Sequence, residues 1–168
     1  MPRIALTLIA AAFCLTLTLS PVAHAGIADS PLPVLVAGQT TLHLYSVPGV
    51  LRSGGVETLF SCTSLEQTAT IQVGVELFPG PGGAPGNDAV ATSLSVGPGA
   101  TAIFGTGGVT WISVNSSLGG ATSRGSARIL ATSKKLACTA FLTDSGNAPP
   151  ASMTYLTIIA KLKQKAAN

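Results

Sequence analysis

The chain has 168 residues, a formal net charge of +3 and only 9% charged residues, against about 25% in an ordinary soluble domain. So small and scattered a charge excludes a nucleic-acid-binding surface. The length is sufficient for one domain with its own hydrophobic core.

Residues 1–25 have the features of a cleaved signal peptide. Arg3 supplies a short basic start, an apolar run follows, and Ala23 to Ala25 form a small-x-small cleavage site. The apolar run 4–19 is shorter than the ~20 residues that span a bilayer. We therefore predict cleavage after Ala25, no stable membrane span afterwards, and one periplasmic or extracellular domain over 26–168. A retained membrane anchor is the alternative.

The rest of the sequence alternates apolar and polar residues with a period of two, the pattern of strands with one buried face. The expected strands are 40–47, 56–64, 68–78, 89–96, 100–106, 109–114, 126–133, 136–143 and 153–162. Glycine- and proline-rich turns separate these segments, and the longest such turn is 78–88. About eight or nine short strands predict an all-β, antiparallel, immunoglobulin-like sandwich, with a small β-barrel as the alternative.

Two cysteines, Cys62 and Cys138, remain once Cys14 is removed with the signal peptide. An exported chain with one possible cysteine pair is expected to form that disulfide. Each cysteine shares a strand face with apolar residues, so we expect the bridge to cross the sandwich core. Closing so long a loop stabilises the fold by roughly 4 kcal/mol in the chain-entropy model.

Catalytic and metal-binding residues are scarce. His43 is the one histidine after residue 25, whereas blue copper needs two histidines and catalytic zinc several protein ligands. We expect His43 to be a solvated strand residue, and we predict no metal and no cofactor. The glycines of 78–88 match no phosphate-binding loop.

A glycoside hydrolase would need two paired carboxylates, and the candidates are Glu57, Glu66 and Glu76. The alternation places Glu57 and Glu76 on outward strand faces, so we expect both to be ordinary exposed residues. The sequence therefore predicts a non-enzymatic protein, with a small hydrolase as the least favoured reading.

Ligand or partner contacts are easier to envisage than catalysis. Trp111 follows a glycine-rich turn; a place in the core is the favoured interpretation, and a binding platform is the alternative. Lys161, Lys163 and Lys165 alternate at the C-terminus. The favoured interpretation is a solvated guard against edge-to-edge aggregation, and a basic contact stripe is the alternative.

The segments "FSCTS", "ATIQVGVELF", "VGPGATAIFGT", "GSARILATSKKLACTAFL" and "PPASMTYLTI" resemble a group of small exported bacterial β-sandwich proteins of unassigned function. The placement of the two cysteines is also similar in outline to immunoglobulin domains. However, no tryptophan closely follows Cys62, and Leu136 occupies the place of the corner tyrosine. The resemblance implies architecture and compartment, and it brings no site residues.

These observations predict an exported, non-enzymatic sandwich with a soluble binding or accessory role and an unidentified partner. The alternative is a structural subunit that assembles through strand pairing. Pro31 and Pro33 interrupt the N-terminal stretch that would otherwise be donated as a strand. The choice between a monomer and a self-assembling protein stays open at this point.

Overall fold

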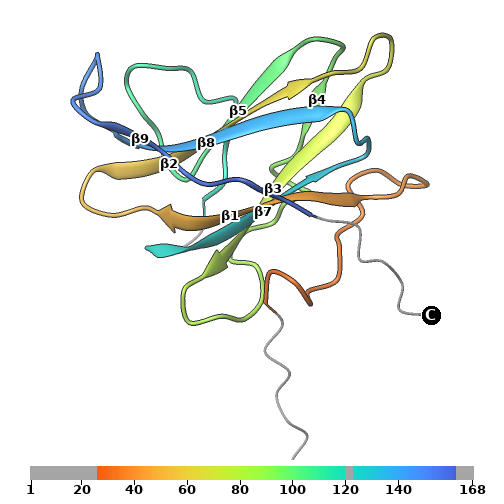
Figure 1. The fold of residues 1–168 in the computed structure, drawn as a ribbon, viewed down its shortest axis with the longest axis horizontal. Coiled ribbons are helices and arrows are strands. Elements are labelled where there is room, and N and C mark those ends of the chain that lie inside the picture. Colours follow the sequence, from red (N-terminus) through yellow and green to blue (C-terminus); the bar gives the residue numbers. More distant parts are fainter. Residues whose placement is uncertain (1–25, 120–122, 162–168) are drawn as a thin grey trace, which may run out of the picture.

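The computed structural model describes residues 26–119 and 123–161, which form two packed sheets of five strands each (Figure 1). Sheet A has the strand order β10-β1-β7-β3-β4, and sheet B has the order β6-β5-β2-β8-β9. The strands are β1 Leu42–Leu51, β2 Val56–Ser64, β3 Ile71–Pro79, β4 Leu94–Val96, β5 Thr101–Gly105, β6 Ser116–Ser117, β7 Arg124–Ala131, β8 Leu136–Asp144, β9 Met153–Tyr155 and β10 Ile159–Ala160. Because the sheets do not close into a barrel, the predicted sandwich is confirmed and the barrel alternative is wrong.

The main core lies between the two sheets and is built from the inward positions of the alternating strands. On β3 these positions are Ile71, Val73, Val75 and Leu77, all buried as the alternation predicts. They pack with Phe60 and other inward residues of both sheets. Removing this apolar surface from water is the main force that holds the sheets together.

Two predicted strands differ from the structure because side chains bind the backbone locally. The Asp88 carboxylate accepts hydrogen bonds from the amides of Val90 and Ala91, which turns the chain and shortens the strand expected at 89–96 to β4. Residues 109–114 form no strand. The chain instead joins β5 as the short parallel strand β6, after Asn115 exchanges hydrogen bonds with the backbone of Ile103.

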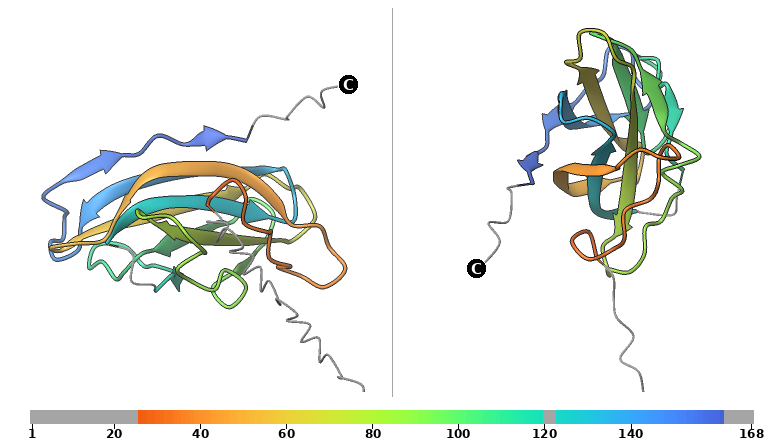
Figure 2. Two further views of the ribbon diagram at one scale, coloured as in Figure 1. Left: turned by 90° about the horizontal axis from the view of Figure 1, so that it is seen from below. Right: turned by 90° about the vertical axis from the view of Figure 1, so that its right-hand side faces the viewer.

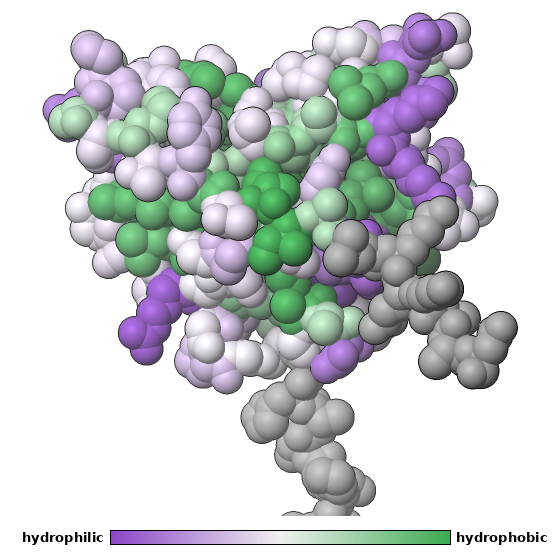
Figure 3. All heavy atoms as spheres, viewed as in Figure 1, coloured by the Kyte–Doolittle hydropathy of each residue, from purple (hydrophilic) through white to green (hydrophobic). Residues whose placement is uncertain are grey.

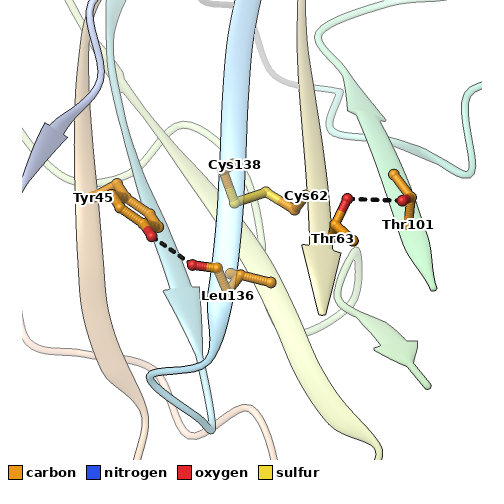
Figure 4. Close-up of a disulfide and its surroundings, with 6 residues drawn as sticks. All are labelled: Tyr45, Cys62, Thr63, Thr101, Leu136 and Cys138. Atoms are coloured by element: carbon orange, nitrogen blue, oxygen red, sulfur yellow. Dashed lines mark hydrogen bonds between the residues drawn. A yellow bond between two sulfur atoms is a disulfide. The ribbon is translucent and has the colours of Figure 1, made fainter. Parts of the chain in front are cut away.

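The disulfide joins Cys62 and Cys138 but does not cross the core. These residues face each other on β2 and β8, which are neighbours in sheet B, with a Cα–Cα distance of 4.1 Å (Figure 4). Immunoglobulin domains instead link strands of opposite sheets. The expectation of a bridge between the sheets was wrong. Alternation along a strand shows on which face a cysteine lies, but it does not show which strand lies beside that cysteine. The likeness to immunoglobulin domains therefore ends at the two-sheet architecture.

The C-terminal segment, residues 153–161, changes sheets and closes one side of the sandwich (Figure 2). Its first part, β9, pairs with β8 in sheet B, and its last part, β10, pairs with β1 in sheet A. The single strand expected at 153–162 is thus split in two. On the same side, the Tyr45 hydroxyl of β1 donates to the Leu136 carbonyl of β8 and links the two sheets (Figure 4).

The N-terminal residues 26–36 lie across the outer face of sheet A. The Arg128 guanidinium, which projects from β7, donates to the carbonyls of Ser30 and Pro31, both at 2.8 Å. Leu35 packs beside them in a small cluster with Ala89 and Leu130. This covering explains why β3 and β7 are buried on both faces.

Candidate ligand-binding surface

Trp111 lies on the outer face of sheet B, outside the core between the sheets. The segment from Thr106 to β6 crosses this face, and the Thr110 amide holds it by donating to the Ser145 carbonyl at 3.2 Å. The indole ring is half-buried, with its centroid 6.1 Å from the ring of Phe141 and the two planes inclined at 40°. Its buried Nε1 finds no hydrogen-bond acceptor among the described residues. The favoured interpretation that Trp111 belongs to the main core is therefore wrong.

Two further aromatic side chains continue the row that Trp111 begins. Phe141 of β8 and Tyr155 of β9 are register partners, and their ring centroids lie 6.2 Å apart with planes at 67°. Phe141 is buried at 7% exposure, whereas Tyr155 is 72% exposed. Met153, on the same face of β9, is also exposed. We call Trp111, Phe141, Tyr155 and Met153 the aromatic shelf.

Hydroxyl-bearing residues continue the same face of sheet B beyond the aromatic shelf. Leu59 pairs with Phe141, and two residues further along each strand Ser61 pairs with Thr139. Because residues two apart in a strand share a face, Ser61 and Thr139 lie beside the shelf. The next outward position of β2 is Thr63, whose hydroxyl lies 2.8 Å from that of Thr101 on β5 (Figure 4). This face thus combines aromatic rings with neutral hydrogen-bonding groups.

The acidic residue on this face, Glu57, is largely buried and engaged. Its Oε2 accepts a hydrogen bond of 2.7 Å from the Thr106 hydroxyl, and Oε1 lies 3.7 Å from Arg52 Nε. A Cβ on Gly107 would lie only 2.5 Å from Oε1, so the loop over sheet B needs glycine there to pass the carboxylate. The prediction that Glu57 is an ordinary exposed residue is wrong.

Glu76 was also expected to be exposed but is buried, with 5% exposure. Its carboxylate accepts a hydrogen bond from Arg128 Nε, and the guanidinium carbon lies 5.1 Å from the centre of the Phe78 ring. The outward direction was predicted correctly, but the N-terminal segment covers that face. Glu66 bonds separately with Ser133 and Lys135, so the structure does not bring the three glutamates together.

His43 is half-buried on β1 rather than solvated. Its Nε2 lies 3.0 Å from the Ser46 hydroxyl. Burial, and then the positive charges of Lys161 and Arg128, lower the pKa of His43 to about 4. The ring is therefore neutral at pH 7.

Of the three C-terminal lysines, Lys161 lies among the described residues. Lys161 is exposed directly after β10, and its amide donates to the Leu44 carbonyl at 2.9 Å. Lys163 and Lys165 lie outside the described residues, so both the edge guard and the basic contact stripe stay predictions.

Other possible sites in the described residues are sparse. No three His, Cys, Asp or Glu side chains of residues 26–119 and 123–161 gather where they could hold a metal ion. The same residues contain no helix with the length and apolar character of a membrane span. An open hollow of about 510 Å³ lies at the ends of β1, β3 and β7 beside Arg124, and it contains none of the predicted contact residues.

Sequence reasoning named Trp111 only as a possible contact, and it missed Phe141, Tyr155 and Met153 as its neighbours. The alternation in 136–143 puts Phe141 on the face opposite Cys138. This was the feature of the sequence that could have placed Phe141 outside the core. Only the folded structure shows that β9 pairs with β8, which brings Tyr155 beside Phe141. No protein-family model, curated protein or solved structure matches this chain, so the site rests on its own geometry.

Proposed function

We propose that the protein is an exported, non-enzymatic binding protein that holds a neutral carbohydrate chain on the aromatic shelf. The observation that carries this proposal is the row of Trp111, Phe141 and Tyr155 on the outer face of sheet B, with Tyr155 72% exposed. An exposed aromatic ring beside other apolar side chains is a typical ligand contact.

Sugar rings suit this surface because each has an apolar C–H face and a rim of hydroxyl groups. The C–H face packs on an aromatic ring, and Tyr155 offers the exposed ring for that contact. The hydroxyl groups then meet Ser61, Thr139 and Thr63 on the same sheet face. The successive ring planes turn by 40° and 67°, which suits a twisted, soluble chain better than a flat crystalline surface.

The charges around the shelf favour a neutral ligand. Glu57 is close to Arg52 and accepts a hydrogen bond from Thr106, so it presents little net charge to a ligand. The outward positions between Glu57 and the far end of β2 are Leu59, Ser61 and Thr63, all uncharged. An acidic polysaccharide would find no matching cation among them.

A binding role is also supported by the local contacts of the ionisable residues. Glu57, Glu66 and Glu76 are each engaged in a different local interaction, and His43 lies in sheet A, away from the sheet that carries the shelf. These three glutamates are therefore not paired with one another.

Export is supported by two independent features. The Cys62–Cys138 disulfide is typical of an oxidising, extracytoplasmic compartment. Residues 1–25, which lie outside the described residues, have the composition of a cleaved signal peptide. We therefore propose that the mature protein acts in the periplasm or outside the cell.

The proposal is tested by affinity electrophoresis of residues 26–168 in native gels that contain soluble xylan, glucomannan or β-glucan, with alginate as an anionic control. At least one neutral polysaccharide should retard the protein. Tyr155→Ala should weaken that binding about five- to tenfold, because an aromatic contact contributes about 1 kcal/mol or more.

Ile159→Ala is the matched control, since Ile159 is 52% exposed on the same C-terminal segment but is not part of the shelf. It should leave the retardation unchanged. Equal weakening by both variants, retardation by alginate alone, or no retardation by any gel would contradict the proposal.

A further inference from the structure

The C-terminal segment is held by two short pairings, one at each end. Three residues of β9 pair with Phe141 to Thr143 of β8. Two residues of β10 pair with Tyr45 and Ser46 of β1. Since β8 and β1 belong to different sheets, this one segment covers an edge of each sheet, and exposed edges are sites where another strand can pair.

The inward side chains of the segment contribute to the core. Leu156 and Ile158 pack against the main core cluster, and the Leu156 amide donates to the Ala140 carbonyl at 2.8 Å. Gly49 has a φ of +77°, and Leu156 Cδ2 lies 3.7 Å from the place where a Cβ on Gly49 would be. Hydrophobic residues gather along the middle of this face, where the segment crosses it (Figure 3).

The outward side of the segment is exposed, and so is much of the loop that leads to it. Met153, Tyr155 and Ile159 are 43%, 72% and 52% exposed. Residues 145–152 connect the segment to β8 along the surface. The Asp144 carboxylate accepts hydrogen bonds from Asn147 and Ser152, and Ser145 at the start of the loop donates to the Gly55 carbonyl. Fully extended, this loop spans about 28 Å, enough to carry the segment to a neighbouring molecule.

We propose that the C-terminal segment is exchanged between two copies of this chain. Each segment then covers the β8 and β1 edges of its partner and forms a closed, two-fold dimer. The strand pairings and the core packing that hold the segment come from β1, β8 and the core beside them, which a second copy presents identically. Exchange therefore needs no new interface, as in other domain-swapped dimers.

The N-terminal segment is not the exchanged element. Arg128 binds the carbonyls of Ser30 and Pro31, and this segment lies across the outer face of sheet A without pairing at an edge. The exchange also builds each shelf from both copies, because Met153 and Tyr155 of one chain would lie beside Phe141 and Trp111 of the partner chain. The inference goes beyond carbohydrate binding and does not depend on it.

The test uses the register pair Ser46 and Ile159 in two single variants of the full mature chain. Unlabelled Ser46→Cys protein is mixed with ¹⁵N-labelled Ile159→Cys protein, concentrated, oxidised and analysed by non-reducing mass spectrometry. Exchange brings the two introduced thiols side by side across two chains and yields a disulfide-linked mixed dimer. Thr139→Cys replaces Ser46→Cys in the control, because Thr139 is exposed on β8 but is not a partner of Ile159.

A mixed dimer that forms with Ser46→Cys and stays at background with Thr139→Cys supports the exchange. Joining Ser46→Cys and Ile159→Cys in one chain should lock the segment internally, and the locked protein should lose the ability to form swapped dimers. Closure of that internal bond also shows that the variants fold. Equal cross-linking by both pairs, or internal closure without any mixed dimer from the single variants, overturns the proposal.

Discussion

The burial of Glu76 and Arg128 depends on tertiary structure and not on the local sequence pattern. Alternation along β3 directs Glu76 away from the core, and this direction is correct. Residues 26–36 then cover the same face, so that Arg128 is 1% and Glu76 5% exposed. The sequence could not predict this covering, because no pattern in residues 26–36 specifies which sheet they contact.

We expect Glu76→Gln to lower the free energy of unfolding by about 3 kcal/mol or more, because Arg128 would remain buried without its counter-charge. Urea denaturation of the mature protein measures this change. Glu66→Gln is the control, since its partner Lys135 is well exposed, and it should have a much smaller effect. Equal effects of the two substitutions would contradict the structural role of the buried pair.

His43 should make stability depend on pH in a defined window. Its folded pKa of about 4 lies below the ordinary value of 6.5, so the unfolded chain binds a proton first as the pH falls. Stability is therefore complete above pH 6.5 and declines towards pH 4, by on the order of 1 kcal/mol once solvent screening is included.

His43→Gln should remove this decline, as measured by urea denaturation at several pH values. Glu66 and Asp144 have pKa values lowered from 4.5 and 3.8 by hydrogen bonds, chiefly from Ser133 and from the Ser152 amide. Their stabilising contributions are full above these ordinary values and decline as the pH falls below 4.5 and 3.8, respectively. An unchanged slope between pH 6.5 and 4.5 in the variant would show that a group other than His43 is responsible.

At the scale of elements, local pattern predicted strands well where both neighbours are strands. The range 56–64 agrees with β2, which lies between β5 and β8. The prediction failed at 109–114, where the alternation of Val109, Trp111 and Ser113 resembles a strand but the chain crosses the face of sheet B. Period two shows that a segment has two faces, and it does not show that a neighbouring strand is available.

The disulfide also acts at this scale, because it joins β2 to β8 within one sheet. Replacing both cysteines, as Cys62→Ala with Cys138→Ala, should lower the free energy of unfolding by about 4 kcal/mol, since the bridge closes a separation of 76 residues. The strands should stay paired, so the circular dichroism spectrum should be unchanged. Thiol reductant should destabilise the parent protein and leave the double variant unaffected; equal stability of the two proteins would contradict a stabilising bridge.

At the scale of the whole molecule, composition and turn spacing were sufficient to predict a two-sheet sandwich. They could not predict the candidate site, whose residues come from the crossing segment, β8 and β9. Trp111 stood out because of its residue type. Tyr155 did not, because its importance depends on the register with Phe141 that only the assembled sheet provides.

The binding surface is tested most directly by amide chemical shifts of the ¹⁵N-labelled mature protein, titrated with an oligosaccharide of the polysaccharide that retards it. Perturbations should gather in residues 106–115, in β8 around Phe141 and in β9 around Tyr155, and should include the Trp111 indole Nε1–H. Perturbations centred on the outer face of sheet A or beside Arg124, with the Trp111 indole unmoved, would contradict the assignment of the outer face of sheet B as the ligand-binding surface.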